Sequence, residues 1–177
     1  LVELGLERDG LAERISEHYR DQRHRGLEPL EDAIDTVRWM RESGCKMALL
    51  TNGAAAAQRS KITRFELADL FDLILIEGEL GYGKPDPRVY QRALQGLNAA
   101  PEETWMAGDN LEWDVAGPQR LGIYGIWIDR GGEGLPAGST VRPDRIVRAL
   151  SELRHPSARA PQHAPGHVRK DEGASRS

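Results

Sequence analysis

Two aspartates in the stretch 108–114, Gly-Asp-Asn-Leu-Glu-Trp-Asp, are the residues of this sequence best suited to chemistry. Asp109 and Asp114 stand five positions apart, after the short apolar run 104–107, which predicts a buried strand. Carboxylates at the carboxyl end of a strand in an α/β sheet are typical ligands of a hard cation such as Mg²⁺. We therefore interpret this stretch as a candidate Mg²⁺ site.

Two further motifs follow other apolar runs and are suited to binding an anion. Thr-Asn-Gly at 51–53 ends the run 46–51 and precedes a predicted helix, so that a hydroxyl, an amide and a helix N-terminus meet there. Lys84 stands between a glycine and a proline, on a stiff segment where its ammonium group can neutralise a phosphate. Each motif alone is more often a turn, a loop or a helix cap. Their shared position after strands predicts one site.

The elements that must position these motifs alternate along the chain. The expected strands are 46–51, 71–76, 104–107 and 123–128, and the expected helices are 8–22, 30–42, 54–65, 87–97, 115–121 and 146–153. Alternating strands and helices predict an α/β fold in which helices cover both faces of a parallel sheet. The carboxyl ends of parallel strands share one edge, which is where the three motifs fall.

Composition limits the class of protein. The 177 residues are 39% hydrophobic and 29% charged, as in ordinary globular domains, and a net charge of −4 argues against a general nucleic-acid binder. No run approaches the ~20 apolar residues of a membrane span. The single cysteine, Cys45, excludes a disulfide within the chain and favours a reducing compartment, so we expect a cytoplasmic protein. Residues 155–177, rich in Pro, His, Arg, Ser and Gly, predict a disordered tail.

Three motifs in this order resemble those of a known family. Leu-Leu-Thr-Asn-Gly at 49–53, Gly-Tyr-Gly-Lys-Pro-Asp-Pro at 81–87 and the stretch 108–114 resemble the second, third and fourth motifs of the haloacid dehalogenase-like hydrolase superfamily. The resemblance covers about residues 1–153 and is to the branch with a small helical cap. It implies a three-layer, Rossmann-like parallel sheet flanked by helices, with part of a helical cap before it.

The resemblance also implies a role for each candidate residue. Thr51 would bind the transferring phosphoryl group, and Asn52 beside it would also bind the phosphate. Lys84 would steady both the nucleophile and the phosphate. Asp109 would ligate Mg²⁺, and Asp114 would support the metal site.

The family's first motif, an apolar strand ending in Asp-x-Asp-x-Thr or Ser, has no match in this sequence. The nearest stretch, Glu-Arg-Asp-Gly at 7–10, has a glutamate where the nucleophilic aspartate belongs. We therefore expect residues 1–28 to be a partial helical cap and residues 29–154 a core that lacks its central first strand, in an N-terminally truncated chain. The strands ending near Thr51 and Ala107 would then close up, receive a strand from a partner, or leave the chain poorly folded.

The predicted function is Mg²⁺-dependent hydrolysis of a small phosphate ester through an aspartyl-phosphate. Because the nucleophile is missing, we expect this chain as written to show no turnover. Two alternatives remain open: a haloacid dehalogenase that works without a metal, and a non-catalytic module that binds phosphate or metal. The expected partner is a small phosphorylated metabolite, with no nucleic acid and no membrane. Neither the substrate nor the oligomeric state follows from the sequence.

Overall fold

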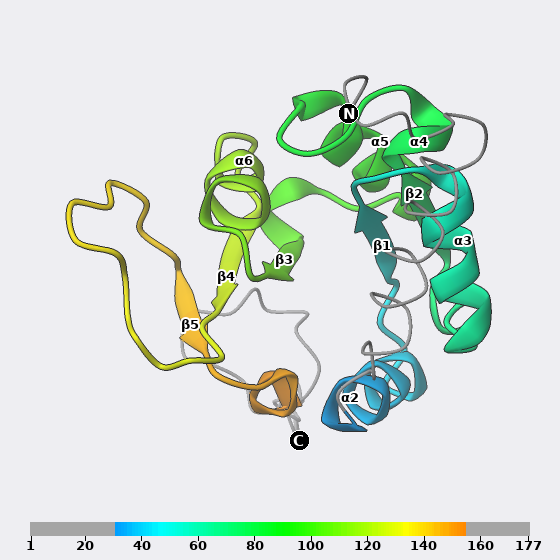
Figure 1. Cartoon of the computed structure of the whole chain (residues 1–177), viewed down its shortest axis with the longest axis horizontal. Coiled ribbons are helices and arrows are strands. Elements are labelled where there is room, and N and C mark those ends of the chain that lie inside the picture. The colour runs from blue at the N-terminus through cyan, green and yellow to red at the C-terminus, as the bar shows by residue number, and fades with distance from the viewer. Residues whose placement is uncertain (1–30, 155–177) are drawn as a thin grey trace, which may run out of the picture. The chain divides into compact units, whose positions relative to one another are not determined.

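The computed structural model describes residues 31–154, which belong to the second of two units, Leu1–Leu30 and Glu31–Ser177 (Figure 1). The expected cap (1–28), the helix expected at 8–22 and the tail (155–177) lie outside the described residues.

Helices and strands alternate through most of this region. The strands are β1 (Ala48–Thr51), β2 (Leu73–Ile76), β3 (Trp105–Gly108), β4 (Tyr124–Ile128) and β5 (Arg145–Val147). The α-helices are α2 (Glu31–Glu42), α3 (Ala55–Arg64), α4 (Glu77–Leu80), α5 (Pro87–Leu97) and α6 (Gly117–Gln119). Short 3₁₀ turns are η2 (Ala68–Leu70), η3 (Pro101–Glu103) and η5 (Leu150–Arg154), and η4 (Leu111–Ala116) is a π-helical turn.

All strand pairs are parallel, and they form two sheets. β1 pairs with β2, where Thr51 lies opposite Ile76, and β3 pairs with β4, which pairs with β5. Within residues 31–154, β1 and β3 do not pair, so the alternative in which these two strands close up does not hold. Their facing edges are the position where the sequence led us to expect a missing strand. That the core lacks a central strand at this position remains a prediction.

Two hydrophobic clusters join the sheets into one layered unit. On one face, α2 and η5 pack against β4 and β5 through a cluster formed by Met40, Ile126, Ile128, Val147 and Leu153. On the other face, α5 packs through a cluster formed by Leu75, Val89, Tyr90, Ala93 and Ile123. Successive residues of β3 face opposite clusters, as strand geometry requires: Met106 joins the second, and its neighbours Trp105 and Ala107 join the first. The result is the predicted helix–sheet–helix arrangement.

Two of the predicted helices were wrong in part. The span 146–153, expected to be a helix, begins in strand β5 and ends in η5. Residues 145–147 form a strand because their backbone pairs with β4. A three-residue strand is too short to show any periodicity in the sequence, so the prediction missed it. The span 115–121 proved to be the end of the π-turn and the short α6. The short helix α4 was not expected at all.

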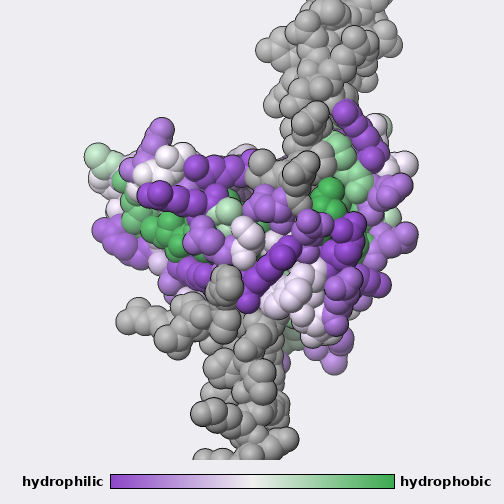
Figure 2. All heavy atoms as spheres, turned by 90° about the horizontal axis from the view of Figure 1, so that it is seen from below, coloured by the Kyte–Doolittle hydropathy of each residue, from purple (hydrophilic) through white to green (hydrophobic). Residues whose placement is uncertain are grey.

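Exposed apolar side chains are sparse in this part of the chain. Figure 2 shows mainly hydrophilic side chains on the face it presents, interrupted by smaller apolar areas. The large hydrophobic residues classed as exposed are Trp113, at 41%, and Ile146, at 45%. None of the described helices has the length and apolar character needed to cross a bilayer.

Candidate active site

The first contact between the predicted motifs joins the end of β1 to the loop that carries Lys84. The Asn52 side chain donates to the Lys84 carbonyl at 2.7 Å and accepts from the Lys84 N–H at 2.9 Å. One amide side chain thus pairs with both polar groups of one backbone residue. Gly83 allows this approach because a Cβ atom there would lie 2.5 Å from Asn52 Oδ1. The geometry favours a positioning role for the Asn52 side chain, whereas the resemblance implied contact with the phosphate.

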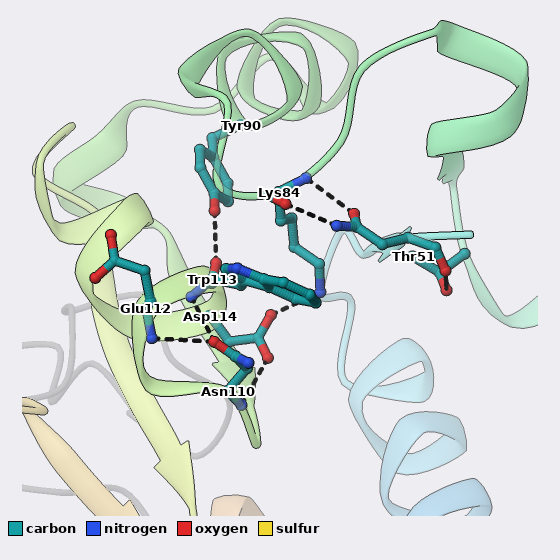
Figure 3. Close-up of polar contacts among 8 residues, drawn as sticks. Thr51, Lys84, Tyr90, Asn110, Glu112, Trp113 and Asp114 are labelled. Carbon is teal, nitrogen blue, oxygen red and sulfur yellow. Dashed lines mark hydrogen bonds and ion pairs between the residues drawn. The ribbon is translucent and has the colours of Figure 1, made fainter.

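The second contact joins Lys84 to the aspartate that follows β3. Lys84 Nζ lies 2.6 Å from Asp114 Oδ1, and the two side chains are only 12% and 5% exposed (Figure 3). An ion pair this well buried is held in a medium of low dielectric constant, where each charge depends strongly on the other. The chain from Asn52 through Lys84 to Asp114 therefore brings all three sequence motifs to one place.

A tight turn after β3 holds Asp114 in position. Asp114 Oδ2 accepts from the Asn110 N–H at 3.0 Å, and the Asn110 side chain in turn accepts from the N–H groups of Glu112 and Trp113. Gly108 lies so close to the Asp114 carboxyl group that any side chain there would collide with it. We call residues 108–114 the acidic turn. Its geometry uses both oxygens of Asp114 for contacts within the protein.

Asp109 differs from Asp114 in its surroundings. It is exposed, and within residues 31–154 its carboxylate forms no hydrogen bond or ion pair. Its backbone is anchored, because the Asp109 carbonyl accepts from Trp127 Nε1 at 3.0 Å. A carboxylate held on a fixed backbone and open to solvent is suited to binding a cation.

The donor set fits Mg²⁺ but does not enclose it. No cluster of three or more His, Cys, Asp or Glu side chains able to hold a metal occurs in the described region. Mg²⁺ is usually held by one or two carboxylates, with waters and substrate phosphate completing its shell. Asp109 offers one open carboxylate for such a shell, whereas both oxygens of Asp114, on the same turn, already have partners within the protein.

Thr51 ends β1 just before α3. The side chain is half-buried, and its hydroxyl makes only a long 3.5 Å contact with the Asn52 carbonyl. The hydroxyl is therefore weakly engaged. The first turn of α3 contains no acidic residue of its own, although the Glu77 carboxylate accepts from the Gly53 N–H just before it.

Two residues near the site were not predicted from the sequence. Glu77, in the first turn of α4, accepts from the Gly53 N–H at 2.8 Å and so fixes the loop after β1. Tyr90 of α5 donates to the Trp113 carbonyl at 2.5 Å. No periodic pattern marks either residue; only the fold brings each to its partner. Cys45 lies before β1, at the opposite end of that strand from the site, and burial raises the pKa of its thiol.

Comparison with known proteins places these features in a family. A family model described as "haloacid dehalogenase-like hydrolase" matches residues 3–122. The chain is 40% identical to a phosphoserine phosphatase of Thermus thermophilus, over 83% of this chain and 59% of that protein.

Solved structures agree on the fold. A HAD phosphatase from Thermococcus onnurineus superposes with a TM-score of 0.67 at 30% identity, covering 85% of this chain and 64% of that one. A 2-haloacid dehalogenase from Pseudomonas syringae gives the same TM-score at 27% identity, covering 85% and 63%. The chain thus spans less than two thirds of the length of each of these relatives.

Proposed function

This chain belongs to the haloacid dehalogenase-like hydrolases, and we propose that it forms the phosphate- and metal-binding part of a phosphatase for small phosphate monoesters. The observation that carries the proposal is the buried ammonium group of Lys84. The ammonium lies at the carboxyl ends of parallel strands, tied to the loop after β1 through Asn52 and to the acidic turn through Asp114.

Lys84 supplies the positive charge that phosphoryl transfer requires. Charge spreads over the phosphoryl oxygens in the transition state, and a preorganised cation in a water-poor site stabilises that charge at little reorganisation cost. The Asn52 contacts fix the backbone from which the ammonium extends. The Thr51 hydroxyl and the N-terminus of α3 would orient the phosphoryl oxygens.

Asp109 would ligate Mg²⁺ directly. Asp114 would fix the acidic turn through the Asn110 N–H and position the Lys84 ammonium through the ion pair. A bound Mg²⁺ would act as a Lewis acid on a phosphoryl oxygen and align the ester for displacement.

The proposed reaction has two displacements. An aspartate oxygen attacks phosphorus, the P–O bond to the alcohol breaks, and the alcohol leaves after taking up a proton. Water then attacks the acyl phosphate, releasing inorganic phosphate and the free carboxylate. Neither aspartate of the acidic turn is proposed for that role, because Asp114 is paired with Lys84 and Asp109 is the proposed metal ligand.

Likeness of fold alone does not separate a phosphatase from a dehalogenase, since both kinds of structure superpose equally well. The acidic pair and the 40% identity to a phosphatase favour the phosphatase. A dehalogenase that needs no metal would keep its activity in the presence of a chelator.

Replacing Asp109 with asparagine tests the metal site in the chain itself. Mg²⁺ at millimolar concentration should raise the thermal unfolding midpoint of the wild type, since a ligand that binds only the folded state stabilises it. D109N should lose this shift while its metal-free midpoint stays within about 2 °C of the wild type, because the exposed carboxylate has no partner to lose. D69N, the same change at an exposed aspartate in η2, is the matched control and should keep the full shift. An equal shift in D109N and the wild type would rule out Asp109 as a ligand.

Catalysis is tested by adding a strand that carries the nucleophilic aspartate. The 177-residue chain with Mg²⁺ should not hydrolyse an aryl phosphate, whereas the same chain preceded by an apolar strand ending in Asp-x-Asp should do so. The matched control carries Asn-x-Asn in that strand and should be inactive. If the extended chain folds cooperatively, binds Mg²⁺ and still fails on a panel of phosphate monoesters, the phosphatase proposal is wrong.

A further inference from the structure

The backbone of the acidic turn continues into η4, whose hydrogen bonds do not follow α-helical spacing. The Gly117 N–H donates to the Glu112 carbonyl, five residues back, as in a π-helix. In an α-helix this N–H would instead have bonded the carbonyl of Trp113. Single π-turns of this kind occur frequently at functional sites.

The wider spacing leaves the Trp113 carbonyl without a backbone donor. The residue five positions on, which would donate next in a π-helix, is Pro118, and proline has no N–H. The Tyr90 hydroxyl fills this place, at 2.5 Å from the Trp113 carbonyl oxygen. A partly buried carbonyl left without a donor would cost free energy, so the contact from α5 stabilises the π-turn.

Tyr90 is well suited to this contact. Its side chain is 1% exposed, and Gly117 provides the space, since a Cβ there would collide with the phenol oxygen. Burial and the charge of Asp114 raise the pKa of Tyr90, so the hydroxyl stays protonated and remains a donor.

The bonded peptide group is the one next to the buried ion pair. The Trp113 carbonyl and the Asp114 N–H belong to one planar peptide unit. Tyr90 holds its carbonyl, and the Asn110 carbonyl accepts from its N–H at 2.8 Å (Figure 3). Hydrogen bonds at both ends restrain rotation of this plane and, with it, the direction in which Asp114 leaves the backbone.

We propose that Tyr90 is a positioning residue: its hydroxyl fixes the peptide plane between Trp113 and Asp114 and thereby sets the cation affinity of the acidic turn. The inference rests on the proposed metal site and adds a residue from α5, outside the family motifs that the sequence revealed. Tyr90 acts through the backbone and makes no contact with metal or substrate.

The test is Y90F in the full chain, with Mn²⁺ as the probe, followed by electron paramagnetic resonance. Y90F should bind Mn²⁺ about 10-fold more weakly than the wild type, the lower end of the loss typical when a group that supports a metal site from its outer shell is removed. Y124F is the matched control: the Tyr124 hydroxyl donates to the Asp144 carbonyl at 3.2 Å, and Asp144 lies outside the acidic turn. Its affinity should equal that of the wild type.

A second measurement does not depend on metal. Amide hydrogen exchange by NMR in metal-free protein should show the Asp114 N–H exchanging about 10-fold faster in Y90F, and unchanged in Y124F. Wild-type protein that binds no Mn²⁺ would contradict the proposed metal site, and the exchange result would still decide the role of Tyr90. Unchanged exchange in Y90F, or equal changes in both variants, would overturn the inference.

Discussion

Replacing Lys84 with methionine is expected to lower the free energy of unfolding by about 3–5 kcal/mol, because it leaves a buried carboxylate without its counter-charge. The side chain of Asp114 is 5% exposed, so water cannot take over the role of the lost ammonium group. D114N should be similarly costly, since Lys84 would keep its charge at 12% exposure. Urea denaturation followed by circular dichroism measures both.

The double variant K84M/D114N separates the ion pair from simple loss of packing. With both charges gone, the double variant should be more stable than either single variant, which would give a coupling energy of at least about 2 kcal/mol. Arg38 and Asp35 on α2 provide the matched control, because their side chains are 53% and 64% exposed. R38M should change stability little, since exposed pairs contribute little. Additive effects of K84M and D114N would contradict the buried-pair interpretation.

The same variants bear on function. K84M removes the charge proposed to meet the phosphoryl group, so it should abolish phosphate binding even under conditions where the variant is fully folded. D114N should instead weaken cation binding. A variant that lost phosphate binding, cation binding and cooperative unfolding together would report only on the fold. The urea denaturation experiment identifies such a variant.

The sequence predicted well those parts of the fold in which the signal is local and long. Helix α5 was predicted with its bounds, because Pro87 stands at its first turn and Asp86 caps its N-terminus, accepting from the Arg88 N–H at 2.9 Å. Strands β1 and β4 were predicted from continuous apolar runs, which are typical of strands buried on both faces.

What the sequence did not predict depends on partners distant along the chain. β5 exists because its backbone pairs with β4. The engagement of Asn52 with the backbone of Lys84, 32 residues away, follows from how the loops after β1 and β2 meet. The π-turn depends on a proline and on a tyrosine from another helix. Motif spacing predicted which residues would gather, and tertiary contacts decided what each side chain does there.

Gly108, at the end of β3, is the position in the acidic turn where one methyl group should have the largest effect. A Cβ there would overlap the carboxyl carbon and an oxygen of Asp114, so G108A must displace either the strand end or the carboxylate. Displacing the carboxylate would disturb its contact with Lys84, because Asp114 Oδ1 lies 2.6 Å from the Lys84 ammonium. We expect a loss of about 3 kcal/mol, combining overpacking with damage to a buried pair.

A cycle with Asp114→Ala assigns the cause of this loss. In the D114A background the added methyl group meets no carboxylate, so G108A should there cost less than about 1 kcal/mol. G131A is the matched control, since a Cβ at Gly131 would lie 3.4 Å from its nearest neighbour, an ordinary contact. G108A should also weaken Mn²⁺ binding, while G131A should not. An equal cost of G108A with and without the Asp114 carboxylate would show that the strand end, and not the ion pair, requires glycine at this position.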